Sequence, residues 1–451
     1  MTDTTMNGAS HNQTNASPKP KSQGQRQAAA MAAVQKGLKK RYAAERRFQA
    51  YGIAAIAFAA ACLILLFSTI IGKGIPAFTK TDIVFEVTLF PQDIDPTGER
   101  DPQVLSTADY RKPIRQAFGD LFPDVTGRSD KRKLHAIISP GAVFTLRDMV
   151  MSNPDLIGQR VTITVPMSDD IDQFNKGHIL QESPESERRV SDKQIAWFER
   201  LESRGMIETS FNTTFFTAGD SREPELAGIW GALTGSFFTM IVTLILSFPL
   251  AVGAAIYLEE FAPKNKLTAF IEVNINNLAA VPSIVYGLLG LAVFLTFFGL
   301  PRSAPLVGGM VLSLMTLPTI IIASRAALKA VPPSIREAAL GMGASRVQCV
   351  FHHVLPLAMP GILTGTIIGM AQALGETAPL LMIGMVAFVV DIPGSITDPA
   401  TVMPVQIYLW SDSPERAFTE RTSAAIMVLL SFLIMMNALA VILRKRFERK
   451  W

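Results

Sequence analysis

The stretch EAALGMGASRVQCVFHHVLP, from Glu337 to Pro356, is polar and lies between long apolar segments. Ser334 stands three residues before Glu337, which is the spacing of a capping box, so a short helix is predicted to begin there, just after two prolines. Gly341 and Gly343 are expected to end that helix, because glycine tolerates a positive φ and permits a sharp turn. A second short helix is predicted from Ser345 toward Pro356.

This predicted hairpin would present small side chains to another protein. Ala338 and Ala339 are expected on its surface, where they leave room for a partner's groove. An ordinary amphipathic loop hairpin has the same spacing, because capping boxes and glycine turns are common in soluble proteins. The spacing alone therefore leaves both interpretations open.

Apolar blocks decide the class of protein. The chain has 451 residues, of which 49% are hydrophobic and 18% are charged, and the apolar residues are concentrated in blocks. The first block, 50–72, is long enough at about 1.5 Å per residue to cross a hydrocarbon core about 30 Å thick. Further spans are predicted at 228–258, 278–300, 305–324, 357–388 and 422–443. We therefore expect an all-α polytopic membrane protein with six transmembrane helices.

Basic residues beside these blocks predict the orientation. Within the N-terminal segment 1–49, residues 1–27 are polar and expected to be disordered, and a basic run between 36 and 47 should hold this end in the cytoplasm. The first block has no small-residue cleavage pattern after it, so it should be retained. Threading six spans then places the basic clusters between them and the tail 444–451 in the cytoplasm. No nucleic-acid partner is expected, because the basic residues form no stripe with interleaved aromatics.

Residues 73–227 are predicted to form a small α+β domain on the extracytoplasmic side of the membrane. Residues 161–166 and 207–215 alternate between apolar and polar as strands do, and the second run places Ile207, Thr209, Phe211, Thr213 and Phe215 on one face. Ser191 and Gln194 have capping-box spacing, which predicts a helix that Gly205 closes.

This domain shows no ligand pattern. His135 and His178 are isolated in the sequence, and the cluster of Asp169, Asp170 and Asp172 is expected to be a solvated turn rather than a metal site. No disulfide is expected, because Cys62 lies in an apolar span and Cys349 in the polar hairpin.

Glu376 is the candidate for a role inside the membrane. A carboxylate at membrane depth costs at least a few kcal/mol, so such residues face a bundle interior or an aqueous path. Gly375 and Pro379, with Thr377 between them, are expected to open the helix, and Gln372 is placed to share a hydrogen bond with Glu376. We expect Glu376 to act as a gate or as an ion-pair partner for a cation on another helix. The alternative is an acidic residue that has reached the outer interface.

The hairpin resembles the signature of ABC importer permeases. In that signature EAA is followed by three residues, Gly, nine residues, Ile, one residue and Leu-Pro. The matching residues here are Glu337, Ala338, Ala339, Gly343, Leu355 and Pro356, and His353 takes the place of isoleucine. Residues 276–292, NNLAAVPSIVYGLLGLA, and 355–381, LPLAMPGILTGTIIGMAQALGETAPLL, resemble the A-type permease subunit of the bacterial high-affinity phosphate importer.

The resemblance implies a type I ABC importer permease fold over 228–443, with a coupling element at 334–356. It also implies that inorganic phosphate is moved across the inner membrane by alternating access. The implied partners are a second homologous permease subunit forming a heterodimer, two ATPase subunits and an extracytoplasmic phosphate-binding protein, all working within membrane lipid. No phosphate-binding loop G-x-x-x-x-G-K-[ST] is found in the sequence, so the chain is not expected to be an enzyme or to bind a cofactor, and ATP would be used by the ATPase subunits.

One position departs from the family. Phosphate permeases usually carry an arginine three residues before the GET tripeptide, where this chain has Gln372. Either the partner permease supplies the cation, or Gln372 reads the substrate by neutral hydrogen bonds, or the substrate is another small oxyanion or phosphonate. Arg325 is expected to be a topology anchor. A membrane-anchored sensor is a remote alternative, and the inserted domain would either steady the binding protein or decorate the outer face.

Overall fold

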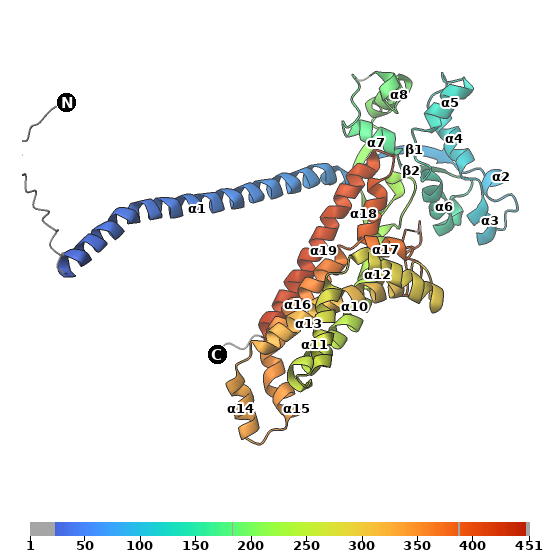
Figure 1. The fold of residues 1–451 in the computed structure, drawn as a ribbon. Helices are drawn as coiled ribbons and strands as arrows, with labels where there is room; N and C mark the ends of the chain where they lie inside the picture. The colour runs from blue at the N-terminus through green and yellow to red at the C-terminus, as the bar shows by residue number, and fades with distance from the viewer. Residues whose placement is uncertain (1–22, 183, 387, 448–451) are drawn as a thin grey trace, which may run out of the picture. The chain divides into compact units, whose positions relative to one another are not determined.

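The computed structural model describes residues 23–182, 184–386 and 388–447. The chain divides into two compact units, Met1–Ser68 and Thr69–Trp451. Helix α1 (Gln23–Gly74) has 52 residues, contains the first predicted span and forms the described part of the first unit up to Ser68, and its last turns belong to the second unit (Figure 1). The expected disorder of 1–27 lies outside the described residues up to 22, and from Gln23 the chain is helical. Strong helix formers such as Ala, Gln, Lys and Arg explain why the helix starts well before the apolar block.

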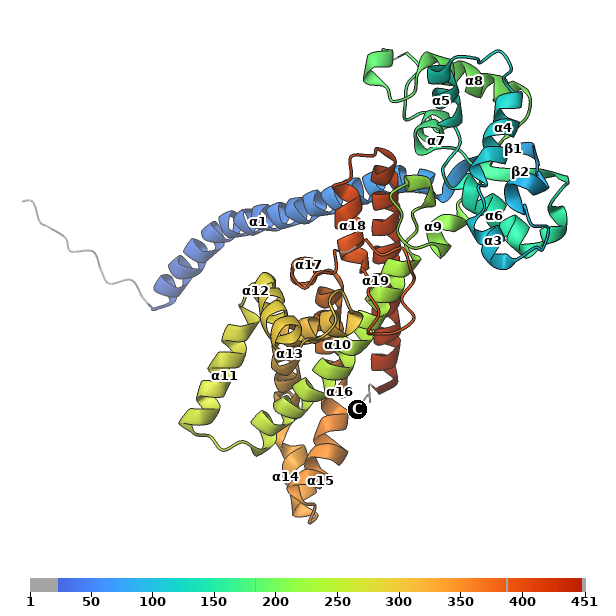
Figure 2. The same cartoon turned by 90° about the vertical axis from the view of Figure 1, so that its right-hand side faces the viewer.

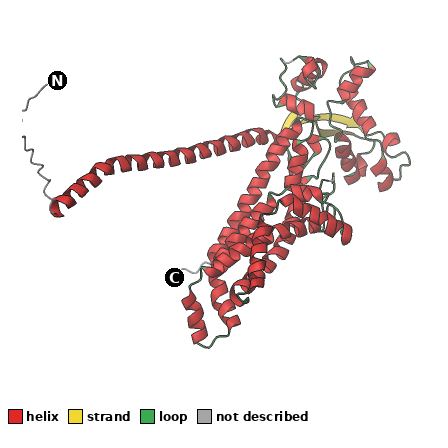
Figure 3. Ribbon diagram, in the orientation of Figure 1, coloured by secondary structure: helices red, strands yellow, loops and turns green. Residues whose placement is uncertain are grey.

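The second unit begins with an inserted domain, which is α+β as predicted. Its three-stranded antiparallel sheet has the order β2-β1-β3, from β1 (Thr79–Thr88), β2 (Arg160–Pro166) and β3 (Ile207–Phe211) (Figure 3). In the central strand Ile83, Phe85 and Val87 are buried on one face, and Phe85 stands opposite Ile163. The strand predicted at 161–166 is confirmed, whereas β1 was not predicted although it alternates in the same way.

The strand predicted at 207–215 was wrong beyond Phe211. Asn212 accepts a hydrogen bond from the Phe215 amide at 3.2 Å and donates one to the Ala77 carbonyl. This side chain therefore caps α9 (Thr213–Thr217), and Phe215 is buried in a helix instead of a strand.

Helices cover the sheet and fill the core of the inserted domain. Ser191 and Gln194 form the predicted capping box at the start of α8 (Asp192–Ser203), and Gly205 follows that helix with a φ of +69°. Ile195, Phe198 and Leu201 of α8 stand three residues apart, so they share one face of the helix, and all three are buried. The other helices are α2 (Pro91–Ile94), α3 (Pro102–Thr107), α4 (Arg111–Asp120), α5 (Arg128–His135), α6 (Ala142–Ser152) and α7 (Asp169–Asn175), with short 3-10 turns at η1 (Ile75–Phe78), η2 (Pro154–Leu156), η3 (Glu185–Glu187) and η4 (Pro224–Leu226).

Long apolar helices form the rest of the second unit. By length and composition, five described helices are able to cross a membrane, or six if one bent pair counts as a span. Besides α1 they are α10 (Trp230–Ile256) with η5 (Tyr257–Phe261), α13 (Pro305–Lys329), α15 (Arg346–Gln348) continued by η7 (Cys349–Val354) and α16 (Leu355–Leu374), and α19 (Ala417–Phe447). A Cβ on Gly365 of α16 would lie 2.2 Å from the Ala323 Cβ of α13, so small residues permit this close helix packing.

Two predicted spans differ from the structure. Instead of one span at 278–300, α11 (Lys266–Ala279) and α12 (Ser283–Leu289) with η6 (Gly290–Phe297) form a pair bent by 103° at Pro282. The span predicted at 357–388 ends at Leu374, and the chain continues through α17 (Ala378–Met382) and α18 (Met403–Ser411). Proline removes a backbone donor and disfavours helix in the residue before it, which accounts for the break at Pro282.

Candidate functional site

The predicted hairpin is present at the end of α13. The first helix is α14 (Pro333–Gly341), Gly343 turns the chain with a φ of +89°, and Ser345 caps α15 in a capping box with Gln348. The capping box expected at Ser334 was wrong. The residue before α14 is Pro332, and it makes no side-chain capping bond. Pro333 has a fixed φ suited to the first turn, so the helix starts one residue earlier than Ser334. Figures 1 and 2 show this hairpin and the inserted domain at opposite ends of the helix bundle.

The tip of the hairpin is exposed, but one alanine is not. Glu337 and Ala338 are exposed, as is Met342 at the turn. Ala339 was predicted on the surface and is instead 2% exposed, packed in a cluster with Val350 and Val354. A helix as short as α14 must bury one apolar face to stay packed against the rest of the protein, and Ala339 contributes to that face.

The second half of the signature lies where the hairpin joins α16. Leu355 and Pro356 are half-buried in the first turn of α16. His353 is exposed and its neighbour Val354 is buried, so histidine in place of isoleucine leaves the local core intact.

Arg336 fixes the hairpin to the neighbouring spans. Its Nη2 donates to a Glu260 carboxylate oxygen at 2.6 Å and to the Leu328 carbonyl at 2.9 Å, and its Nη1 donates to the Val331 carbonyl at 2.8 Å. Glu260 lies in η5, at the end of α10, and Leu328 lies in α13. One guanidinium therefore links the ends of two spans to α14, with the bidentate geometry that makes such pairs strong.

A second ion cluster lies beside this one. Glu259 is 3.6 Å from Arg325 and 3.5 Å from Lys329, and Arg325 also pairs with Glu272 at 2.8 Å. Sequence reasoning assigned these basic residues to topology alone and overlooked their acidic partners. The adjacent Glu259 and Glu260 at the end of an apolar block were the available signal.

The chain opens at the GET tripeptide, as predicted. α16 ends at Leu374, Gly375 is its C-cap, and Thr377 precedes α17. Because of this break, Gln372 and Glu376 are not neighbours along one helix, and the expected hydrogen bond between them is absent from the described residues. Gln372 is exposed and Glu376 is half-buried.

Pro379 holds the segment after the break against the bent pair. A Cβ added to Gly287 of α12 would lie 2.6 Å from the Pro379 Cα, so only glycine fits there. Within the ranges the structure describes, no ion pair or hydrogen bond reaches the Glu376 carboxylate. Arg325 does not supply its cation, since that side chain is 13% exposed and engaged by Glu259 and Glu272.

The inserted domain is fastened to α19 through its first turn. Glu420 lies 3.3 Å from the Lys176 amine and 2.5 Å from Nδ1 of His178, and Lys176 also pairs with Asp172 at 2.6 Å. The next residue, Arg421, donates to the Ala227 carbonyl at 2.6 Å. His178 is isolated in the sequence, and its acidic partner Glu420 comes from a distant helix, α19.

The aspartate cluster of the inserted domain is not a solvated turn. Asp169, Asp170 and Asp172 form the first turn of α7, and Asp172 accepts hydrogen bonds from the Thr81 amide and hydroxyl at 2.9 and 2.7 Å. Acidic residues in a first turn complement the helix dipole. Burial and the adjacent Asp170 raise the pKa of Asp169 to about 6, and burial raises the pKa of Glu225 to about 7. No group of three potential metal ligands occurs among the described side chains.

Two family models match the chain. Residues 247–451 match "Binding-protein-dependent transport system inner membrane component", and residues 35–185 match a domain of unknown function, DUF3333. The chain is 34% identical over 188 residues to the probable ABC transporter permease protein YqgI of Bacillus subtilis, covering 42% of this chain and 63% of that protein.

Other relatives have names that state a substrate. The chain is 30% identical over 222 residues to the phosphate transport system permease protein PstA 1 of Mycobacterium tuberculosis, covering 49% of this chain and 72% of that protein. The inward-facing MetNI methionine ABC transporter aligns with a TM-score of 0.38 and 17% identity, covering 49% of this chain and 98% of that chain.

The transport family model and the curated relatives define a class, the permease subunits of ABC importers, which are not themselves enzymes. Within that class the chain belongs to the PstA-type permease family, with the type I importer permease fold and an inserted α+β domain. The chain spans 63% and 52% of the length of the first two relatives, both from Bacillus subtilis.

Proposed function

We propose that this chain is the permease subunit of an ATP-driven importer that carries inorganic phosphate across the inner membrane by alternating access. The observation that carries the proposal is the exposed α14–α15 hairpin, which Arg336 fixes to the ends of α10 and α13. A partner that moves the hairpin would move both spans, which is how a soluble ATPase switches a membrane bundle. The partners are two ATPase subunits, a second permease subunit and a phosphate-binding protein.

Phosphate as the substrate is supported by relatives named for phosphate transport and by the GETAPL element at 375–380. Gln372 stands where the family has arginine, and it is exposed near the break in α16. Uptake of labelled phosphate by a deletion strain, with and without this gene, tests the substrate, with sulfate and methylphosphonate as competitors. Restored uptake that only phosphate inhibits supports the proposal. Uptake blocked equally by another oxyanion or phosphonate would favour a different substrate.

The proposed arrangement puts the hairpin and both termini in the cytoplasm and the inserted domain outside. Met342 at the hairpin turn is 78% exposed and Leu180 of the inserted domain is 64% exposed, which makes both suitable for cysteine labelling. In a Cys62→Ser background, an impermeant thiol reagent should label Leu180→Cys in intact cells and Met342→Cys only after the membrane is opened. Labelling of Met342→Cys from outside would invert the arrangement and remove the basis of the proposal.

A further inference from the structure

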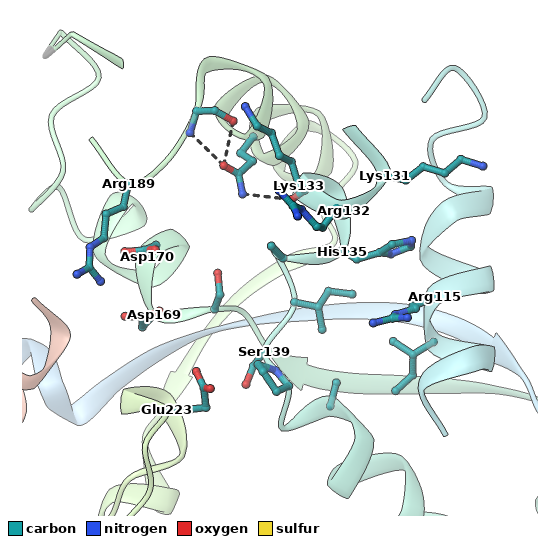
Figure 4. A pocket seen from close by; sticks show the side chains of 18 of the residues that line it. Arg115, Lys131, Arg132, Lys133, His135, Ser139, Asp169, Asp170, Arg189 and Glu223 are labelled. Carbon is teal, nitrogen blue, oxygen red and sulfur yellow. Dashed lines mark hydrogen bonds between the residues drawn. The ribbon is translucent and has the colours of Figure 1, made fainter. Parts of the chain in front are cut away.

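A cavity of about 1500 Å³ lies in the inserted domain (Figure 4). This domain and the α14–α15 hairpin lie at opposite ends of the helix bundle (Figure 1). Helices α4 and α5 contact each other and supply much of its lining. Arg111 and Arg115 are four residues apart on α4, and Arg128 and Arg132 are four residues apart on α5, so each pair shares a helix face. The basic side chains on this wall are Lys133, which pairs with Glu185 at 4.0 Å, and five others: Arg111, Arg115, Arg128, Lys131 and Arg132.

Five of the positive charges on this wall are not compensated by an ion pair. Among the residues that the structure describes, none of these five side chains takes part in an ion pair. Other basic residues of the inserted domain do have acidic partners, for example Lys112 with Asp93 and Lys193 with Asp130. Like charges gathered without counter-charge repel one another, so the wall favours a bound anion.

A buried guanidinium offers further N–H donors that lack partners. The Arg188 side chain lines the cavity and is only 4% exposed. It pairs with Asp192 through Nη2, but Nε and Nη1 are buried and have no hydrogen-bond partner within the described ranges. Burying polar N–H groups without partners is unfavourable, and an anion in the cavity would partly offset that cost.

His135 reports the sign of the local potential. Burial lowers the pKa of His135, and the positive charges of Arg115 and Lys131 lower it further. Figure 4 shows these three residues on one side of the cavity and Asp169, Asp170 and Glu223 on the other. An anion would therefore be confined to the α4–α5 side, because the acidic side repels it.

We propose that the inserted domain binds a small anion bearing two or more phosphoryl groups in this cavity, held by Arg115, Lys131 and Arg188. Guanidinium groups match phosphoryl oxygens in bidentate fashion, and several unpaired cations need more negative charge than one phosphate carries. A recessed cavity with a buried arginine suits a small molecule better than the acidic face of a protein. This site is separate from the transport path.

Calorimetric titration of the purified full-length chain with tripolyphosphate tests the proposal. Saturable binding is expected, with phosphate and citrate at least about tenfold weaker, because neither combines phosphoryl geometry with comparable charge. The imidazole pKa of His135, followed by NMR, should rise when tripolyphosphate binds. Citrate binding as tightly as tripolyphosphate, or no saturable binding, would overturn the proposal.

Two double variants distinguish a specific anion-binding site from general electrostatic attraction of the anion to the protein. Arg115→Gln combined with Lys131→Gln should weaken tripolyphosphate binding at least about tenfold, whereas Arg115→Lys, which keeps the charge, should retain most of it. Arg160→Gln combined with Arg200→Gln removes the same charge from exposed residues outside the cavity, and should leave binding unchanged. Equal loss in both double variants would show that no specific site exists, provided each variant keeps the unfolding temperature of the parent chain.

Discussion

Nδ1 of His178 lies 2.5 Å from a carboxylate oxygen of Glu420, so a residue of the inserted domain meets the first turn of α19. The Glu420 side chain is 8% exposed and also pairs with Lys176, whose side chain is 12% exposed. These contacts join the inserted domain, which follows the first span in the sequence, to α19, which is the last span. A movement of α19 during transport would therefore be transmitted to the inserted domain.

Removing the carboxylate should loosen this joint. Glu420→Gln is expected to lower the free energy of unfolding by about 2 kcal/mol, because it leaves a largely buried Lys176 with one acidic partner fewer. The measurement is thermal unfolding of the purified protein. Glu86→Gln is the matched control, since Glu86 pairs at 3.5 Å with Arg160 and both side chains are exposed. An equal effect of the two substitutions would show that the joint does not stabilise the protein.

Stability should depend on pH through Glu225. Burial raises the pKa of Glu225 from 4.5 to about 7, with Asp169 and Glu223 adding to the rise. The folded protein then holds this proton more tightly than the unfolded chain. Its contribution is complete below pH 4.5 and is lost as the pH rises through about 7, at a cost of about 3 kcal/mol.

Glu225→Gln should remove this dependence. Thermal unfolding followed from about pH 4 to about pH 8, which covers the pKa of the unfolded and of the folded state, should show a smaller fall in the variant. Asp169, with a pKa raised to about 6, should leave part of the slope in place. A variant with the same slope as the parent would contradict the assignment to Glu225.

Arg336 should couple the hairpin to the spans. Arg336→Lys keeps a positive charge but loses the bidentate contact with Glu260 and the link to two carbonyls, at a cost of about 2 kcal/mol. We expect phosphate uptake to fall while ATP hydrolysis by the assembled transporter continues. Arg346→Lys is the control, because Arg346 is exposed and has no ion pair in the part of the chain that is described. Parallel loss of uptake and hydrolysis in Arg336→Lys would argue for simple unfolding.

Gly343 should be required for the shape of the hairpin. Its φ of +89° is unfavourable for any other residue, and no atom lies near its missing Cβ, so Gly343→Ala should cost about 1 to 2 kcal/mol through the backbone alone. Gly341→Ala is the control, because Gly341 ends α14 and also has open space around it. Alanine there should be neutral or stabilising by up to about 1 kcal/mol. Co-purification of the ATPase should fall only in the first variant.

The sequence was sufficient for features that depend on local chemistry. Long apolar blocks predict spans, and the capping box at Ser191 places a helix start correctly, because both signals lie within a few residues. The capping-box spacing at Ser334 misled, because the prolines before it start α14 one residue earlier. The central strand β1 carried an alternating pattern that could have been used. The turn at Gly343 was predicted from the conformational freedom of glycine.

Features that depend on distant residues were not predictable in this way. Arg336 and Glu260 are 76 residues apart, and nothing in the spacing of either shows that they meet. Ala339 is buried because Val350 and Val354 return to cover it. The bend of 103° between α11 and α12 and the close packing of Gly287 on Pro379 likewise depend on neighbouring helices. Such contacts determine the geometry of the α14–α15 hairpin and of the break after α16.

Cysteine cross-linking to the ATPase tests the central claim most directly. In a Cys62→Ser background, Ala338→Cys on the exposed face of the hairpin is co-expressed with the ATPase subunits and treated with a short thiol cross-linker. A cross-link from Ala338→Cys to the ATPase, with none from Leu180→Cys on the inserted domain, is the result we predict. A cross-link from Leu180→Cys, or none from Ala338→Cys in an assembled complex, would contradict the account.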